Sequence, residues 1–293
     1  MSVVGFDINN YEIKNKPNVS NDIRFVLISD LHLTEKRKES LLNAENILEE
    51  ITAINPDFVC IAGDLVDGNR ECKTVPDYTY SFLERLAKVT SVFYGIGNHE
   101  DVVLKSEFEK IKSLGVIVLD NEKIRIDSLK VEIAGLTSGL RTMFSEEERE
   151  NLRKKGKAKY SNVAHRLYCY FRMMLGSLLN KITGRIPKSM PKLEVLERWE
   201  EEKDNASYFK ILISHHPEYY KLVKNYRCFD LMLSGHAHGG QIRIGKRGLY
   251  APGQGLFPKL VKGLYYNSRL LVSAGAIFLL FINKPEIITV SLK

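Results

Sequence analysis

Residues 23–32 read IRFVLISDLH, an apolar run that ends in a carboxylate and an imidazole. Its first part, residues 23–29, is mostly apolar and rich in β-branched side chains, which predicts a buried strand. Asp30 and His32 follow the run directly, so a carboxylate and an imidazole stand at the carboxyl end of that strand. Active sites of open α/β sheets gather outside the carboxyl ends of strands, so we expect functional side chains here.

Runs of the same kind recur along the chain and alternate with helical patterns. Residues 39–54 place Leu48 and Ile51 at helical spacing, and residues 80–89 and 107–114 are shorter helix candidates. Strand–helix alternation predicts an α/β core with a largely parallel or mixed sheet. Further strands are predicted over residues 58–62, 91–95, 130–135, 209–214 and 231–234, with closing strands over 270–281 and 286–292.

The composition is that of an ordinary globular protein. The chain has 293 residues, 44% of them hydrophobic and 27% charged, which is enough for a sizeable core without a disulfide or a structural metal. The four cysteines are scattered and form no CxxC pair. This pattern argues against a zinc ribbon or a thiol redox motif, and it suits a reducing cytoplasm.

We expect neither a signal peptide nor a membrane-spanning segment. The amino terminus, MSVVGFDINNYEIKNK, lacks the basic start and apolar stretch of a signal peptide. The longest apolar run, residues 270–282, has 13 positions and is too short to span a bilayer. We expect a cytoplasmic protein. The basic segment described next adds the expectation that the protein associates peripherally with the inner surface of the membrane.

One region interrupts the alternation of strands and helices. Residues 144–204 begin acidic, turn basic and end acidic again, and residues 151–192 hold 11 Lys or Arg and no Asp or Glu. The net charge of +7 therefore belongs to this segment. We predict a single domain over residues 1–293 with an amphipathic helical insertion over 144–204. The apolar positions that recur every three or four residues are Val163, Leu167, Phe171, Met174, Leu178 and Ile182.

Two interpretations of this insertion stay open. Its apolar stripe can pack on the body of the domain while its charges are solvated. Alternatively, residues 151–192 form a basic amphipathic lid that lies on an anionic membrane or shelters an acyl chain. Nucleic-acid binding is less favoured, because Met173, Met174 and Leu178 offer more apolar surface than a duplex would use.

Five short motifs stand just past predicted strands, and they contain six of the seven histidines. Only His165 lies outside them. A lone histidine is more often structural than a ligand, but burying six imidazoles beside aspartates without a cation would be costly. The motifs are Asp30-Leu31-His32, Gly63-Asp64-Leu65-Val66-Asp67, Gly97-Asn98-His99-Glu100, Ser214-His215-His216-Pro217 and Gly235-His236-Ala237-His238-Gly239-Gly240-Gln241.

The residue types in these motifs suit a binuclear metal site. Carboxylates, imidazoles and an amide oxygen favour Mn, Fe, Zn or similar ions, and no thiolate is offered. A carboxylate such as Asp64 can bridge two ions about 3.5–4 Å apart, which polarise phosphoryl oxygens and lower the pKa of a shared water. The pattern predicts two divalent metal ions, and the ligand types leave their identity open.

In their order and spacing, the five motifs resemble those of the calcineurin-like metallophosphoesterase superfamily. The resemblance covers residues 23–99 and 209–241. It implies a sandwich of two mixed β-sheets flanked by helices, and a hydrolase that cleaves a phosphate ester with metal-activated water. It further implies one metal held by Asp30, His32, Asp64 and His238, and a second held by Asp64, Asn98, His215 and His236.

The same resemblance implies roles for two more residues. His99 would face the phosphate, as general acid to the leaving oxygen or as a stabiliser of developing charge. Asp67 would orient His99 through a hydrogen bond. His216 matches no ligand position, and it is left as a phosphate contact or as support for a ligand.

Two details bear on the substrate. The Ser/Thr protein phosphatases of the superfamily carry an arginine where this chain has Gly68, which argues against protein phosphatase activity. The last motif, GHAHGGQ at residues 235–241, resembles a branch of bacterial phosphoesterases, often membrane-associated, that act on phosphodiesters or lipid-linked phosphates. We expect a phosphodiester or a lipid-linked phosphate or pyrophosphate as substrate. The alternatives are a phosphomonoesterase or protein phosphatase, or a catalytically inactive scaffold of the same fold.

Overall fold

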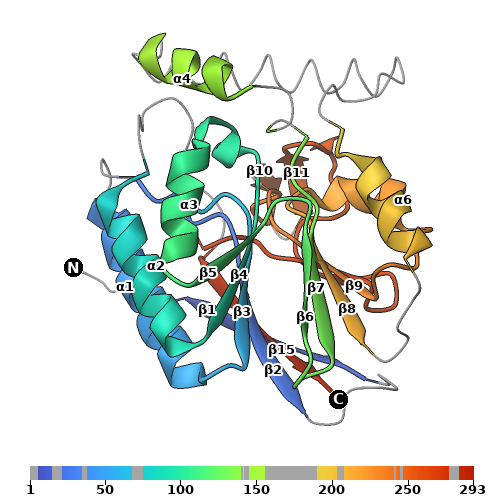
Figure 1. The fold of residues 1–293 in the computed structure, drawn as a ribbon. Coiled ribbons are helices and arrows are strands. Elements are labelled where there is room, and N and C mark those ends of the chain that lie inside the picture. Colours follow the sequence, from blue (N-terminus) through green and yellow to red (C-terminus); the bar gives the residue numbers. More distant parts are fainter. Residues whose placement is uncertain are drawn as a thin grey trace.

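The strands of the described residues form two large mixed sheets that face each other and a small third sheet (Figure 1). The computed structural model describes residues 6–14, 22–34, 38–67, 75–139, 141, 145–155, 190–202, 208–240, 242–244, 247–276 and 284–293.

The first large sheet combines strands from both ends of the chain. In spatial order it contains β1 (Asp7–Ile13), β15 (Glu286–Leu292), β2 (Ile23–Ile28), β3 (Phe58–Ala62), β4 (Ser91–Gly95) and β5 (Val116–Leu119). Strands β2 to β5 are parallel neighbours, whereas β15 runs antiparallel to β2 and parallel to β1. The last strand in the sequence thus lies between the first two.

The second large sheet has parallel central strands and antiparallel edges. In spatial order it contains β13 (Gly263–Tyr265), β14 (Leu270–Val272), β9 (Leu231–Ser234), β8 (Phe209–Ile213), β7 (Val131–Gly135) and β6 (Lys123–Ile126). Only β13 and β6 pair antiparallel with their neighbours among these strands. The small sheet contains β10 (Ile242–Ile244), β11 (Arg247–Ala251) and β12 (Gly255–Leu256).

Helices cover the outer faces of both large sheets (Figure 1). The first sheet is covered by α1 (Lys38–Ile54), α2 (Asp77–Val89) and α3 (Lys105–Ser113). The second is covered by α6 (Leu193–Glu201), η3 (Pro217–Tyr219) and α7 (Tyr220–Val223). A further helix, α4 (Glu146–Lys155), contacts the short 3-10 helix η1 (His99–Val102) that follows β4.

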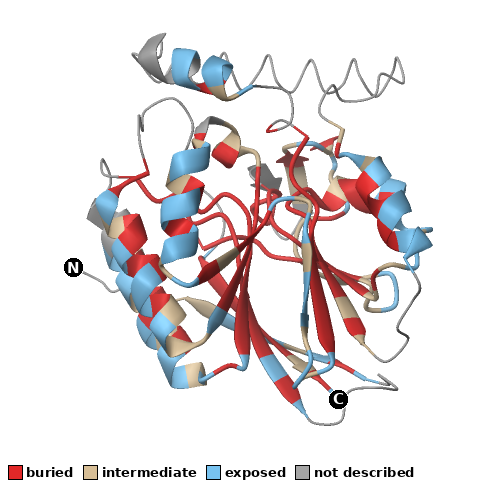
Figure 2. Cartoon of the chain, viewed as in Figure 1, coloured by how far each residue is buried: buried red, intermediate tan, exposed pale blue. Residues whose placement is uncertain are grey.

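Alternating side chains along each central strand build the core in layers. In β2, Phe25 and Leu27 point between the two sheets, while Val26 and Ile28 pack under the helices. Phe58 of β3 stacks on Phe25 with ring centroids 4.9 Å apart. Strands buried on both faces need apolar side chains at every position, which is why these runs are continuous rather than alternating (Figure 2).

The predicted α/β sandwich of two mixed sheets flanked by helices is confirmed. The differences from the prediction are the length of one closing strand and several additional strands. The closing strand predicted over residues 270–281 is wrong in its length, because β14 ends at Val272. Gly275 then adopts φ +87 and lies against Asp30, so the chain turns into the end of the sandwich. Residues 277–283 lie outside the described residues. Strands β1, β5, β6 and β10 to β13 are additional to those predicted.

The segment over residues 144–204 is described only at its two ends. These ends hold α4 and α6, and α6 buries Val195, Leu196 and Trp199 against the second sheet. The amphipathic helix predicted around residues 163–182 lies outside the described residues. Among the helices of the described ranges, none is both long and apolar enough to cross a membrane.

Candidate metal centre and active site

The five motifs meet at one end of the sandwich because each follows a strand of a parallel group. The motifs that begin at Asp30, Gly63 and Gly97 follow β2, β3 and β4 of the first sheet. Those that begin at Ser214 and Gly235 follow β8 and β9 of the second sheet. The backbone N–H of His236 donates to both carboxylate oxygens of Asp30, at 3.1 and 3.0 Å, which joins the two sheets directly.

One group of candidate ligands consists of Asp30, His32 and His238. Nε2 of His238 lies 3.5 Å from Oδ1 of Asp30, and Nε2 of His32 lies 3.9 Å from the same oxygen. Burial lowers the pKa of both imidazoles, and the neighbouring imidazole of His99 lowers them further. The two rings are therefore neutral at physiological pH, which is the form that binds a metal.

A second group consists of Asp64, His215 and His236. Nε2 of His215 lies 3.1 Å from Oδ2 of Asp64. Nδ1 of His215 donates to the carbonyl oxygen of Ala62 at 2.6 Å, which fixes the ring and turns Nε2 toward the carboxylates. Burial alone would lower the pKa of His215, but the carboxylates of Asp64 and Asp30 outweigh it and raise this pKa to about 10.

Asp64 belongs to both groups of ligands. Its Oδ2 lies 3.1 Å from Nε2 of His215 and 3.8 Å from Nε2 of His32. Its Oδ1 accepts the backbone N–H of His99 at 2.8 Å. Burial opposes ionisation, but the imidazoles of His215 and His99 hold the pKa of Asp64 well below its usual range. A permanently charged carboxylate stands at the centre of the cluster.

These residues fit a pair of divalent metal ions. The side-chain oxygen of Asn98 is buried and has no hydrogen-bond partner among the residues that the structure describes. An amide oxygen left in that state costs about 1–3 kcal/mol, whereas a cation would satisfy it. The donor set of carboxylates, imidazoles and one amide suits Mn, Fe or Zn. The seven residues that the family resemblance leads us to expect as metal ligands all lie in the turns that meet here.

The backbone of the cluster is strained. Asp30, His32, Asp64, His236 and His238 all adopt left-handed conformations, with φ between 45° and 65°. Such conformations cost about 1–3 kcal/mol each for residues with a Cβ, and they persist only where the surroundings enforce them. Gly63 has φ +81, and a Cβ there would lie 2.7 Å from the Cα of Gly97. The turns after β3 and β4 are therefore in direct backbone contact.

Glu100 supports the site in a way that the sequence does not reveal. It is fully buried, and its carboxylate accepts the backbone N–H groups of Gly97 at 2.7 Å, Asp64 at 3.0 Å and Leu65 at 2.8 Å. Burial, with the charge of Asp64, raises the pKa of Glu100. The residue ends the Gly97-Asn98-His99-Glu100 motif, and this position was the only available signal of its role.

His99 and Asp67 form a pair at the edge of the cluster. Nδ1 of His99 lies 3.3 Å from Oδ1 of Asp67, and Nε2 lies 3.8 Å from Oδ2 of Asp64. Burial would lower the pKa of His99, but the charges of Asp64 and Asp67 outweigh it and raise this pKa to about 9. The His99 side chain is 17% exposed, so part of the ring is open to solvent, while its Nδ1 is buried.

His216 lies beside the cluster but does not face its carboxylates. Its Nε2 is 2.9 Å from Oγ of Ser138, and its Nδ1 is 3.3 Å from Oε1 of Glu218. Its ring packs on that of His236 with centroids 4.2 Å apart. The ligand atoms of His216, Glu218 and His236 lie within 4.8 Å of one another. Both ring nitrogens of His216 have protein partners. This arrangement favours a role in supporting the His236 ring over a role as a metal ligand.

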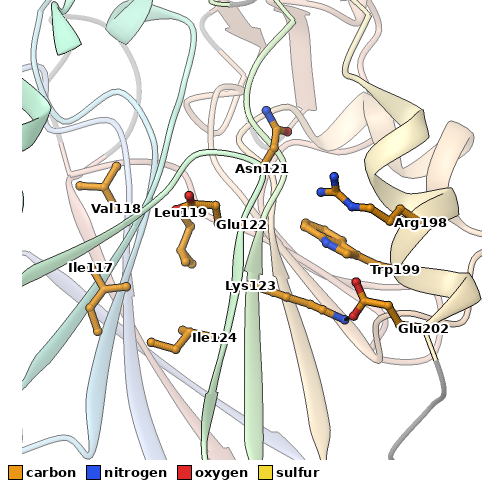
Figure 3. A pocket seen from close by; sticks show the side chains of 10 residues that line it. All are labelled: Ile117, Val118, Leu119, Asn121, Glu122, Lys123, Ile124, Arg198, Trp199 and Glu202. Carbon is orange, nitrogen blue, oxygen red and sulfur yellow. Dashed lines mark ion pairs between the residues drawn. The ribbon is translucent and has the colours of Figure 1, made fainter.

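A separate hollow of about 450 Å³ opens between the edge strands β5 and β6 and helix α6 (Figure 3). Figure 3 shows Arg198 and Trp199 reaching toward it from α6, with Lys123 on β6. Lys123 pairs with Glu202 at 2.5 Å. None of the candidate metal ligands lines this hollow.

Comparison with known proteins gives a family and several relatives. A model of the family described as calcineurin-like phosphoesterase matches residues 23–240. An uncharacterized metallophosphoesterase of Campylobacter jejuni is 27% identical over 89% of this chain and 56% of its own length. An uncharacterized metallophosphoesterase of Bacillus subtilis is 24% identical over 81% of this chain and 71% of its own length.

The chain spans only part of such relatives. A metallophosphoesterase of Helicobacter pylori is 23% identical over 75% of this chain, and the match covers 46% of that protein. The chain thus spans about half the length of the Campylobacter and Helicobacter proteins. Among solved structures, a dimetal phosphatase from Danio rerio has a TM-score of 0.48 at 11% identity, covering 86% of this chain and 87% of that one.

Proposed function

The chain belongs to the calcineurin-like phosphoesterase family, a family of metal-dependent hydrolases, and on this premise we propose that its buried cluster binds two divalent metal ions and hydrolyses a phosphate ester. The observation that carries the proposal is the shared position of Asp64. Its Oδ2 lies within 3.8 Å of imidazole nitrogens from both ligand groups, as a bridging carboxylate requires.

Each ion would have its own ligands besides this bridge. In each of the two groups, three possible ligand atoms lie within 4.8 Å of one another. The first ion would be held by Asp30, His32, Asp64 and His238, and the second by Asp64, Asn98, His215 and His236.

The protein itself would supply the proton for the leaving group. Bound divalent ions polarise the phosphoryl oxygens and make hydroxide available near neutrality. His99 has a raised pKa and a side chain that solvent can reach, so it can donate a proton to the leaving oxygen. Asp67 holds the other ring nitrogen of His99 and keeps Nε2 directed toward the cluster.

We place the substrate among phosphodiesters and lipid-linked phosphates or pyrophosphates. The support is the resemblance of the last motif, residues 235–241, to a bacterial branch with such substrates. The basic stretch of residues 151–192 adds a second proposal, peripheral binding to anionic membranes. Co-sedimentation with anionic but not zwitterionic vesicles is the expected result, and no sedimentation with either would remove the membrane proposal.

Hydrolysis of bis-p-nitrophenyl phosphate and p-nitrophenyl phosphate tests the proposed function. Chelator-stripped protein would be reloaded with Mn, Fe(II) or Zn, and metal content would be measured alongside turnover. We expect metal-dependent cleavage that favours the diester, with two ions bound per chain. His165→Ala is the matched control, because His165 is the histidine outside the five motifs.

The variants give outcomes that can be told apart. His236→Ala should weaken binding of one ion. His99→Ala should keep both ions and lower turnover of an alkyl phosphodiester, whose leaving oxygen needs a proton, by about 10²–10⁴-fold. Faster cleavage of the monoester than of the diester would contradict the proposed diester specificity but not the proposed phosphoesterase activity. A protein that binds two ions but cleaves neither ester with any metal would favour the inactive scaffold.

A further inference from the structure

Two buried arginines hold the loop that carries His99, and one of them comes from α4. Arg141 is 6% exposed and Arg149 is 8% exposed, although guanidinium groups are seldom buried. Neither residue lies in the five motifs, and neither is close enough in sequence to His99 to be suspected from the motif. The proposed chemistry gives these two charges no direct role.

Arg141 binds the backbone of the short helix η1 and of the residue that follows it. Its Nη1 donates to the carbonyl oxygen of Glu100 at 2.8 Å and to that of Val103 at 2.6 Å. Its guanidinium also lies over the Phe108 ring of α3, 4.6 Å from the centroid. These contacts fix the backbone immediately after His99 against the first sheet's helix layer.

Arg149 connects this loop to α4. Its Nε donates to the carbonyl oxygen of Asp101 at 3.0 Å, and its Nη2 donates to that of Arg141 at 2.5 Å. Its Nη1 pairs with Glu146 of the same helix at 2.8 Å. Glu146 in turn accepts the backbone N–H of Lys105, at the start of α3. One side chain therefore joins the His99 loop, the Arg141 turn and α4.

Burying two neighbouring arginine cations is energetically unfavourable, so the contacts that offset this cost are of interest. Burial lowers the pKa of Arg141, and the nearby charge of Arg149 lowers it further, so the two cations destabilise each other. Their hydrogen bonds to buried carbonyl oxygens offset that cost, because carbonyls left without donors would be penalised. Helix α4 has little apolar surface to hold it in place, since acidic and basic residues make up most of its sequence.

We propose that Arg149 is a positioning residue for His99, and that α4 fixes through it the loop from which His99 protonates the leaving oxygen. This inference rests on the proposed function of His99. Arg149 contacts Asp101 two residues after His99, so its loss would change the direction of the imidazole without removing a metal ligand. Misplacement by about 1 Å is enough to cost about 100-fold in rate.

The test compares two diesters that differ in their need for a proton. An alkyl phosphodiester expels an alkoxide that requires protonation, whereas a p-nitrophenyl diester expels a stable phenolate. We expect Arg149→Ala to lower turnover of the alkyl diester about 10–100-fold and that of the p-nitrophenyl diester less than about threefold. Bound metal should stay at the wild-type level. Arg198→Ala, at an exposed arginine of α6, is the matched control.

A second background decides whether the effect passes through His99. In the His99→Ala protein, adding Arg149→Ala should change neither rate further, because the positioned group is already absent. Should Arg149→Ala fail to fold, Arg149→Lys keeps the buried charge but cannot make all three contacts, and it should show the same selective loss.

Equal losses on both diesters, a further loss in the His99→Ala background, or loss of metal would each overturn the positioning role. Wild-type rates in Arg149→Ala beside an impaired His99→Ala protein would overturn this inference alone. An unimpaired His99→Ala protein would overturn the proposed role of His99 and this inference with it.

Discussion

At the scale of single residues, the pairing of His99 with Asp67 leads to a prediction about pH. His99 must be protonated to act as an acid, so turnover of a substrate with a poor leaving group should fall as pH rises through its pKa. Asp67 raises that pKa together with Asp64, toward about 9. Asp67→Asn removes one of these charges, so the alkaline limb of the pH–rate profile should move to lower pH.

The measurement is kcat/KM against pH for an alkyl phosphodiester in both proteins. Asp77→Asn, a surface change on α2, serves as control. An alkaline limb that does not move in Asp67→Asn would show that Asp67 does not set the protonation of His99.

His215 leads to a second prediction, about protons released by metal binding. Carboxylates raise its pKa to about 10 in the metal-free protein, above the unfolded value near 6.5. Stability from this proton is therefore fully present below about pH 6.5 and is lost as pH rises through about 10. Because a metal ion must displace the proton, apparent affinity should increase with pH between these values, by up to about tenfold per unit for each proton.

Calorimetric titration with Zn or Mn in buffers of different ionisation enthalpy measures the released protons. We expect about one proton from His215 at pH 7.5, and fewer in His215→Ala. An observed heat that is independent of the buffer would contradict this prediction.

The sequence identifies single site residues well where side-chain chemistry carries the role. Asp30, Asp64 and His215 stand out because ionisable groups directly follow apolar strands. Glu100 and Arg149 do not stand out, since their partners are backbone groups of turns whose shapes no residue type reveals.

At the scale of elements, Glu100 ties the turn after β3 to the turn after β4. Glu100→Gln would place an amide N–H₂ against backbone donors, since four N–H groups donate to the two carboxylate oxygens. We expect a loss of about 1–3 kcal/mol in the free energy of unfolding of the metal-free protein. Urea unfolding measures it, and Glu109→Gln, exposed on α3, is the control. Equal stability of both variants would contradict the proposed role of Glu100 in holding the two turns together.

Elements buried on both faces are the ones that the sequence predicts. The continuous apolar runs of β2, β3, β4, β8 and β9 indicate strands, because a strand that is buried on both faces needs apolar side chains at every position. Strand β1, with the sequence DINNYEI, is missed because an edge strand pairs on one side and tolerates polar residues. Strand β6 is missed for the same reason. The partner of β1 is β15, at the other end of the chain, so the pairing of β1 depends on contacts far away in sequence.

At the scale of the whole molecule, the candidate ligands come from both sheets, so metal removal should loosen the sandwich. Ions bind only the folded state, and at about 100 times Kd they add about 2.7 kcal/mol per site to the free energy of unfolding. Calorimetric scans with metal and with excess chelator should show a lower Tm after chelation. Asp64→Asn should show a much smaller difference, and an unchanged Tm in the wild type would contradict binding across the sheets.

The position of β15 has a consequence for how the protein is made. This strand is translated after every other described element, yet it lies between β1 and β2, the first two described strands in chain order. A nascent chain can therefore pair β2 with β3 and β4 early, but the gap beside β2 stays open until Glu286–Leu292 emerges. Until then β2 offers an unpaired apolar edge to other chains. Chaperone binding during synthesis should concentrate on that edge and end when β15 inserts.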